Sequence, residues 1–267
     1  MKIHNAPMAT THAPSAANRA ADLDPKRAVT RDRFDAVLFD LDGVLTSTAA
    51  IHADAWKTMF DEFLRARDGA SFRPFDIAVD YKRYVDGKPR YEGVRSFLGS
   101  RGIDLPEGDP SEEPGDATIC ALGNRKDAMV KVAIDAGRVE SFEGSVRWVR
   151  KLRDEGFKLA VVSSSRNCAE VLRAAKIDDL FEARVDGVTL VEMSLPGKPA
   201  PDSFIKAAEL LGTTAARSVV VEDALSGVEA GRAGKFGLVI GVDREGHGDQ
   251  LRQHGADLVV RDLAEML

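Results

Sequence analysis

The sequence predicts an α/β protein: an open, doubly wound parallel sheet (a Rossmann-like core) with a mostly helical cap domain inserted after the first strand. Two observations predict this fold. Short apolar runs without polar alternation, typical of strands buried on both faces, alternate along the chain with helical patterns. About a hundred residues separate the first run from the next clear one, which exceeds an ordinary connection and indicates an inserted module.

The predicted strands are rich in Val and Leu, and several end in polar residues. The first ends at Asp40, the second in serines, and the third at Glu222 and Asp223. The expected strands lie at 34–40, 157–165, 217–224, 236–242 and 256–260. In parallel α/β sheets, ligands bind outside the carboxyl ends of the strands, so these polar ends are the candidate site.

Apolar residues at helical spacing fill the connections between these strands. Asp202 is a candidate N-cap and Gly212 a candidate C-terminal end for one helix, and Gly156 suits the C-terminal end of another. The expected core helices lie at 144–156, 167–177, 202–212 and 224–234.

The long interval after the first strand has a helical pattern over most of its length. Its helices are expected at 55–67, 91–102 and 124–137, and the Pro-, Gly- and acid-rich segment 103–123 is expected to be a loop. The predicted organisation is a mobile N-terminal tail at 1–32, the α/β core at 33–45 and 141–267, and the helical cap at 46–140.

Composition excludes several functional classes. The net charge of −6 argues against a nucleic-acid partner. No apolar run approaches the ~20 residues that span a bilayer, and the first residues lack the apolar core of a secretory signal. The two cysteines have no CxxC spacing, which fits a reducing compartment. We therefore expect a cytoplasmic protein without membrane or nucleic-acid partners, acting on a small molecule as a monomer or weak dimer.

Carboxylates, hydroxyls and one lysine collect at the predicted strand ends. Four carboxylates, on Asp40, Asp42, Glu222 and Asp223, make a candidate site for a hard cation, with Mg²⁺ the expected ion. Lys198, in the "PGKPAPD" loop, is suited to hold the oxygens of a phosphoryl group opposite that cation.

The spacing of Asp40 and Asp42 has a chemical explanation in such a site. A cation removes the repulsion between the two carboxylates. One carboxylate can then attack phosphorus, while its neighbour handles a proton on the entering or leaving oxygen. Gly43 follows them directly and lets the chain turn sharply beneath the site.

The sequence resembles the haloacid-dehalogenase superfamily of phosphotransferases. Four segments match the motifs of that family in order, "DLDGVLTST", "VVSSS", "GKPAPDSF" and "VEDALSG", and they cover the core from residue 34 onward. Within the superfamily the chain is similar to the β-phosphoglucomutase branch. The branch-specific matches are Thr48, His52 and Trp56 in the first motif, Arg90 in "GKPR", and Ser163, Ser164, Ser165 and Asn167 in "SSSRN".

The resemblance implies a role for each matching residue. Asp40 is the implied nucleophile and Asp42 the implied acid/base. The implied Mg²⁺ ligands are Asp40, the backbone carbonyl of Asp42, and Asp223, with Glu222 either a direct ligand or a group behind the ligands. Ser163 and Lys198 would bind the transferring phosphoryl group, Arg90 a second phosphate, and His52, Trp56, Ser165 and Asn167 the substrate. Ser164 would contribute its backbone amide, and Thr48 would belong to the hinge.

The sequence departs from the branch in two places, one at the second phosphate site and one in the length of the cap. Asp86 stands where related caps often place a basic residue, and Lys88 is a candidate to compensate. The cap also carries extra sequence around 66–84 and 103–123.

Three functions compete at this stage. The first is a mutase that interconverts β-glucose 1-phosphate and glucose 6-phosphate through a phosphorylated aspartate and a bisphosphate. The second is a phosphatase of small sugar or polyol phosphates on the same scaffold. The third is a catalytically silent phosphosugar-binding protein, which would not need a nucleophile beside a proton carrier.

Overall fold

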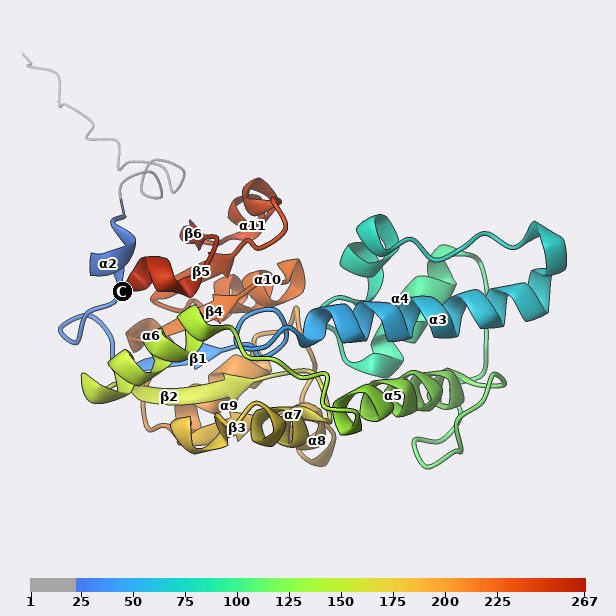
Figure 1. Cartoon of the computed structure of the whole chain (residues 1–267), viewed down its shortest axis with the longest axis horizontal. Coiled ribbons are helices and arrows are strands. Elements are labelled where there is room, and N and C mark those ends of the chain that lie inside the picture. The colour runs from blue at the N-terminus through green and yellow to red at the C-terminus, as the bar shows by residue number, and fades with distance from the viewer. Residues whose placement is uncertain (1–22) are drawn as a thin grey trace, which may run out of the picture.

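The computed structural model describes residues 23–267, which contain one six-stranded sheet. All neighbouring strands pair in parallel, in the order β3-β2-β1-β4-β5-β6 (Figure 1). The strands are β1 (Ala36–Phe39), β2 (Lys158–Val162), β3 (Ala183–Val185), β4 (Ser218–Glu222), β5 (Leu238–Val242) and β6 (Leu258–Val260). The predicted parallel α/β fold is confirmed.

Helices cover both faces of this sheet because alternate residues of the central strands point to opposite sides. Val37 and Phe39 of β1 join one apolar cluster, to which α6 (Glu143–Asp154) and α7 (Cys168–Ala174) contribute. Ala36 and Leu38 join the other cluster, with helices of the second half of the chain. These are α8 (Gly187–Glu192), α9 (Asp202–Leu210), α10 (Leu225–Ala233) and α11 (Gly248–His254). The sheet is therefore doubly wound, as predicted.

The sequence patterns miss three short elements of this core. Strand β3 has three residues, and α8 and α11 have six and seven. Segments of this length contain few apolar positions, so a periodic pattern in them is easily missed. A smaller correction concerns α9, where Pro201 and not Asp202 is the N-cap residue.

The segment between β1 and α6 folds into helices that build an apolar cluster of their own. They are α3 (Thr48–Asp68), the π-helix η2 (Ile77–Val85), α4 (Arg90–Ser100) and α5 (Ile119–Asp135), on the right of Figure 1. Stacked and tilted aromatic rings fill the centre of this cluster, with Phe60 5.3 Å from Trp56 and 4.2 Å from Phe97 between ring centroids.

Two of these helices also reach the sheet. Helix α3 begins seven residues before the predicted start, and its first turns place Ile51 in the apolar cluster on one face of the sheet. The end of α5 does the same with Val130 and Ile134. The start of α3 and the end of α5 therefore lie where the inserted helices meet the core.

The predicted mobile tail does not extend to residue 32. Residues 1–22 of that prediction lie outside the described residues. After them, the short helix α2 (Pro25–Ala28) packs Ala28, 1% exposed, into the apolar cluster of the sheet. Asp24 caps this helix by accepting a hydrogen bond from the Lys26 amide.

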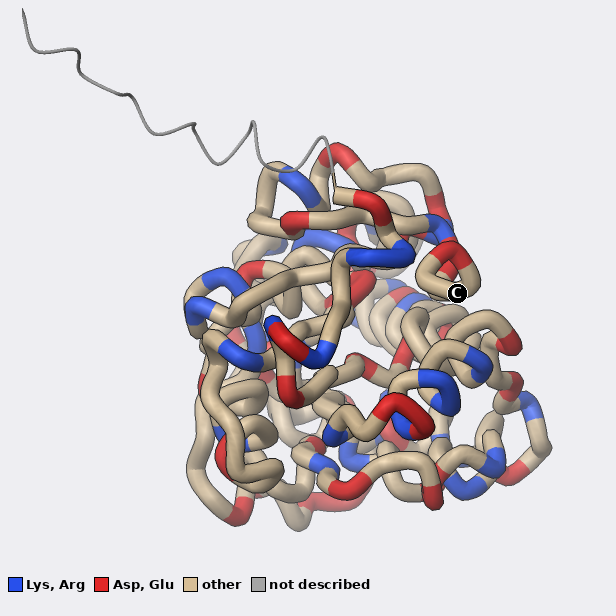
Figure 2. Tube along the Cα trace, turned by 90° about the vertical axis from the view of Figure 1, so that its left-hand side faces the viewer, with Lys and Arg blue, Asp and Glu red and all other residues tan. Residues whose placement is uncertain are grey.

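Within the described residues, none of the helices is long and apolar enough to cross a membrane. Basic and acidic positions are interspersed along the described trace (Figure 2). Neither sign of charge is confined to one part of the described trace.

Candidate active site

The site lies in a cavity of about 290 Å³ between the carboxyl ends of the strands and the inserted helices. Strand β1 lies between β2 and β4, with Phe39 level with Val161 and Val221. This register brings together the residues that follow the three strands, so Asp40, Ser163 and Asp223 all line the cavity.

Lys198 ties two of the predicted carboxylates together. Its Nζ lies 2.5 Å from Asp40 Oδ1 and 2.6 Å from Glu222 Oε1, and it donates a hydrogen bond to the Val162 carbonyl at 3.0 Å. Burial alone would lower the pKa of Lys198, but the charges of Asp40 and Glu222 outweigh burial and raise it above its ordinary value. The lysine is therefore a fixed cation behind the nucleophile candidate.

Asp40, Glu222 and Asp223 form a carboxylate cluster, with one oxygen from each lying within 4.8 Å of the others. Burial, and then the charges of Asp86 and Asp40, raises the pKa of Asp223 well above its usual range. Hard divalent cations favour such a set of oxygen donors, and a bound cation would relieve the repulsion. Gly43 leaves the space for this cluster, because a Cβ there would lie 1.8 Å from Asp223 Oδ2.

Both carboxylate oxygens of Glu222 already have partners within this cluster. Its Oε1 pairs with Lys198, and its Oε2 accepts hydrogen bonds from the backbone amides of Asp223 and Ala224, both at 3.1 Å. These contacts hold the loop that carries Asp223 and leave Asp40 and Asp223 as the more available donors for a cation.

Asp42 contacts residues of both helix α3 and the serine loop after β2. The Thr48 hydroxyl donates a hydrogen bond to Asp42 Oδ1, and the Ser163 hydroxyl donates to Asp42 Oδ2 at 3.4 Å. His52 Nε2 lies 3.6 Å from Asp42 Oδ1. Three neighbours thus fix the orientation of the carboxylate predicted to be the acid/base.

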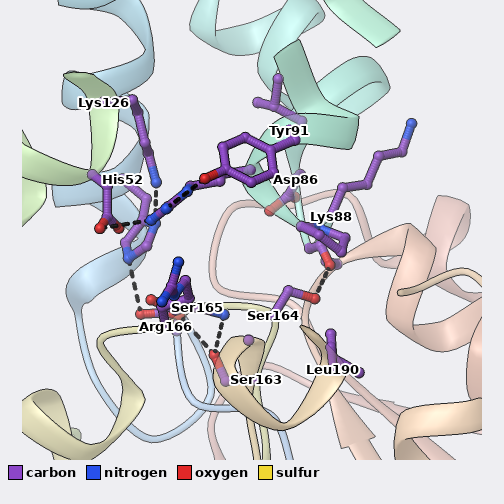
Figure 3. A pocket seen from close by; sticks show the side chains of 18 of the residues that line it. His52, Asp86, Lys88, Tyr91, Lys126, Ser163, Ser164, Ser165, Arg166 and Leu190 are labelled. Carbon is purple, nitrogen blue, oxygen red and sulfur yellow. Dashed lines mark hydrogen bonds and ion pairs between the residues drawn. The ribbon is translucent and has the colours of Figure 1, made fainter. Parts of the chain in front are cut away.

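His52 is held by a buried lysine that the sequence analysis missed. Lys126 Nζ lies 2.7 Å from His52 Nδ1, and it also lies 4.9 Å from the centre of the Trp56 ring (Figure 3). Burial, and then the charge of Lys126, lowers the pKa of His52 to about 4. Near neutral pH the ring is therefore neutral, accepting from Lys126 at Nδ1 and directing an Nε2 proton toward Asp42.

Trp56 combines two predicted roles. It lines the cavity, and it is 3% exposed and stacked on Phe60 in the apolar cluster of the inserted helices. Its ring therefore forms part of the cavity wall while it stabilises the inserted helices.

Arg90 lies in the same cavity and is surrounded by partners from two helices. Its Nη2 donates to Asn124 Oδ1 at 2.7 Å and to the Tyr91 hydroxyl at 2.9 Å, and its Nη1 lies 2.7 Å from Asp127 Oδ2. The sequence analysis predicted Arg90 but none of these partners. Asn124 and Asp127 lie on α5 and Tyr91 lies on α4, where they look like ordinary helix surface residues, so no sequence signal marks them.

The serine loop after β2 joins the core to the inserted helices. The Ser164 hydroxyl donates to the Gly87 carbonyl at 2.7 Å, and Asn167 Nδ2 donates to Asp127 Oδ1 at 2.9 Å. The Ser165 amide donates to the Ser163 hydroxyl at 3.1 Å (Figure 3). Ser164 therefore contributes its side chain to the contact between the core and the inserted segment. Arg166, which was not predicted, also lines the cavity.

Asp86 lines the cavity, but Lys88 does not compensate for its charge. Lys88 Nζ hydrogen-bonds to Ser96 Oγ at 3.2 Å, and in Figure 3 its side chain points away from the labelled serines. Burial, and then the charge of Glu222, raises the pKa of Asp86 to about 7. Position 86 therefore presents a carboxyl group to the cavity where related caps often have a basic residue.

Comparisons with known proteins show which family the chain belongs to. The family model for haloacid dehalogenase-like hydrolases matches residues 34–235. A β-phosphoglucomutase of Mycobacterium bovis is 51% identical over 242 residues, covering 88% of this chain and 92% of that protein. A β-phosphoglucomutase of Bacillus subtilis is 34% identical over 233 residues, covering 86% of this chain and 91% of that protein.

A solved structure shows the same fold. The crystal structure of a β-phosphoglucomutase from Clostridium difficile superposes with a TM-score of 0.70 at 22% identity, covering 88% of this chain and 93% of that one. The motif residues, the parallel sheet and the family match lead to one conclusion: the chain belongs to the haloacid dehalogenase-like hydrolase family and is an enzyme of its β-phosphoglucomutase-like branch.

Proposed function

We propose that the protein is a Mg²⁺-dependent phosphosugar mutase that interconverts β-glucose 1-phosphate and glucose 6-phosphate through a phosphorylated Asp40 and a bisphosphate intermediate. The observation that carries the proposal is one cavity with a candidate nucleophile, Asp40, and a guanidinium, Arg90, in its wall. A mutase needs both, because its intermediate carries two phosphate groups at once. The similarity to proteins named β-phosphoglucomutase supports the same activity.

Asp40 is the residue that carries the phosphoryl group between the two sugar oxygens. In the phosphorylated enzyme, the 6-hydroxyl of β-glucose 1-phosphate attacks phosphorus, and the bond to Asp40 breaks. The bisphosphate then rotates in the cavity so that its other phosphate faces Asp40. Asp40 attacks the phosphorus of the phosphate on O1, and the bond between that phosphorus and O1 breaks. Lys198, held against Asp40, stabilises the negative charge of the transferring group throughout.

Asp42 balances the protons of these two steps. It takes the proton of the attacking 6-hydroxyl and later returns a proton to the leaving O1. Thr48 and Ser163 hold the Asp42 carboxylate by hydrogen bonds, and the neutral His52 ring faces the same carboxylate. Small shifts of helix α3, which carries both His52 and Thr48, would move Asp42 into or out of line with the hydroxyl.

Asp40, Asp223 and the backbone carbonyl of Asp42 would hold Mg²⁺, and Glu222 would orient Asp223 and Lys198 from behind. The ion supplies charge neutralisation for the transferring phosphoryl group when bound. Arg90 and Ser165 in the cavity wall, with Asn167 beside Asp127, would hold the second phosphate, and Trp56 would form the wall beside the sugar. The partner is thus a small sugar phosphate of the cytoplasm, with the protein acting as a monomer or weak dimer.

The second candidate is a phosphatase of small sugar or polyol phosphates. The matched family model describes hydrolases. In addition, Asp86 places a carboxyl group in the cavity where related caps often have a basic side chain for the second phosphate. In that function water, and not a sugar hydroxyl, accepts the phosphoryl group from Asp40.

One assay separates these functions. The protein is incubated with Mg²⁺, β-glucose 1-phosphate and a trace of glucose 1,6-bisphosphate, and glucose 6-phosphate and free phosphate are measured together. The mutase proposal predicts glucose 6-phosphate without matching release of phosphate. Phosphate alone would support the phosphatase, and sugar-phosphate binding without either product would support a silent binding protein.

A variant at the second phosphate site adds an internal control. Arg90→Ala should reduce mutase flux far more than hydrolysis of a small phosphate ester, because only the mutase needs two phosphate sites. Equal losses in the two reactions would show that Arg90 has a structural role instead.

A further inference from the structure

Arg90 is only half satisfied by its neighbours. Its Nη2 has two acceptors, the Tyr91 hydroxyl and Asn124 Oδ1. Among residues 23–267, Nε and Nη1 find no aligned hydrogen-bond acceptor, although both atoms are buried. Unmade donors on a buried guanidinium are unfavourable, so this edge of Arg90 is suited to receive an anion with two oxygens.

Asp127 occupies part of the place where that anion would bind. Its Oδ2 lies 2.7 Å from Arg90 Nη1, and its Oδ1 accepts a hydrogen bond from Asn167 Nδ2 at 2.9 Å. The carboxylate therefore lies between a guanidinium on α4 and an amide in the loop before α7. These are the two kinds of donor that also suit one edge of a phosphate group.

A phosphate and the Asp127 carboxylate cannot both use these donors. Their like charges would repel at contact distance in a partly desolvated site. The Asp127 side chain is 27% exposed, whereas Arg90 is 13% exposed. Asp127 is thus the more mobile candidate of the pair and can turn toward solvent, while the contacts of Arg90 with Tyr91 and Asn124 keep the guanidinium in place.

We propose that Asp127 is an internal competitor for the second phosphate site: its carboxylate holds Arg90 and Asn167 in the ligand-free protein and is displaced when a phosphate group binds. The identity of that phosphate as part of a sugar bisphosphate rests on the proposed function. The competition lowers the affinity of the site for phosphate. In a mutase it also favours release of the bisphosphate from Arg90, which the intermediate requires before it can present its other end to Asp40.

The test uses inorganic phosphate as the probe, titrated calorimetrically into the full-length protein in metal-free buffer. Under these conditions the carboxylate cluster around Asp40 repels phosphate, and binding reports on the Arg90 site. Asp127→Asn removes the charge and keeps the side-chain shape, so the Kd for phosphate should fall about tenfold. Asp135→Asn removes the same charge from an exposed position on α5 and should leave the Kd unchanged.

The double variant Arg90→Ala/Asp127→Asn should lose the gain, because the gain depends on the freed guanidinium. Unchanged or weaker phosphate binding in Asp127→Asn would overturn the inference and show that Asp127 only positions Arg90. A gain that persists without Arg90 would overturn it as well. If Asp127→Asn fails to fold, Asp127→Ala tests the same expectation. None of these measurements needs catalysis, so a protein without mutase activity could still confirm the competition. An active mutase could likewise fail this binding test, so the two proposals fail separately.

Discussion

Lys198 Nζ lies 2.5 Å from Asp40 Oδ1, and both side chains are almost fully buried. The pair places a permanent cation directly behind the candidate nucleophile. Lys198 also pairs with Glu222. The site therefore contains fewer unpaired carboxylates than the sequence alone suggests.

Lys198→Met should therefore damage both activity and stability. Loss of a preorganised cation at the transferring phosphoryl group should lower kcat by about 10²–10³-fold. Two buried carboxylates would lose their partner, which should destabilise the fold by roughly 3 kcal/mol. Steady-state kinetics and thermal melting measure the two effects. Lys206→Met, at a more exposed ion pair with Glu209, is the control, and equal behaviour of the two variants would argue against this role.

The His52–Lys126 contact predicts an unusual histidine. Burial and Lys126 together hold the pKa of His52 near 4, so the ring should remain neutral with its proton on Nε2 at pH 6. Replacement of Lys126 by Met should raise the pKa of His52, because the repelling charge is gone while Asp42 remains. Nitrogen NMR of labelled histidine reports both tautomer and pKa, and a doubly protonated ring at pH 6 in the wild type would refute the assignment.

Gly43 should be required for cation binding. A Cβ at this position would overlap Asp223 Oδ2, and the residue also has a φ of 87°. Gly43→Ala should displace the Asp223 carboxylate and weaken Mn²⁺ binding by at least tenfold, as measured by electron paramagnetic resonance or calorimetry.

Gly69→Ala provides a matched control for this variant. Gly69 also has a positive φ, of 60°, but a Cβ there meets nothing within 4 Å. Both substitutions carry the backbone penalty of roughly 1 kcal/mol, and only Gly43→Ala should lose the metal. Loss of Mn²⁺ binding in both variants would attribute the effect to backbone strain instead.

The carboxylate cluster predicts that stabilisation by Mg²⁺ increases with pH. Burial raises the pKa of Asp223 well above its usual range and that of Asp86 to about 7. A carboxyl group with a raised pKa in the folded state stabilises the metal-free protein at low pH, and this contribution is lost as pH rises from the ordinary carboxyl pKa through the raised one. A bound cation offsets the loss, so the Mg²⁺-dependent rise in Tm should be several degrees larger at pH 8 than at pH 5.

Melting curves with Mg²⁺ and with a chelator, at both pH values, provide this measurement. A Mg²⁺ effect that is equal at the two pH values, or larger at pH 5, would show that the cluster does not bind the ion as described.

Much of the core could be predicted from sequence because its signals are local. The apolar runs at β1, β2 and β4 are buried on both faces, and their polar ends follow directly along the chain. Parallel pairing brings the ends of such strands to one edge of the sheet whatever the rest of the fold does. Asp40, Ser163 and Asp223 could therefore be assigned to one site without knowledge of the tertiary contacts.

The cap side of the site could not be predicted in the same way. Lys126 and Asp127 lie on α5, where a lysine followed by an aspartate is typical of a solvated helix surface. Their roles come from packing of α5 against α3 and the serine loop, which places Lys126 on His52 and Asp127 on Asn167. The start of α3 was misplaced for a related reason, since its first turn is held by tertiary contacts with the sheet and lacks a side-chain cap.

The most direct test of the central claim is to trap the phosphoryl group on the enzyme. The protein is mixed with Mg²⁺ and glucose 1,6-bisphosphate, quenched in acid within a single turnover, and digested for mass spectrometry. We predict one added phosphoryl group on the peptide that contains Asp40, and none in Asp40→Asn, which should keep its fold and lose turnover. A phosphoryl group on a different residue, or wild-type turnover in Asp40→Asn, would contradict the account.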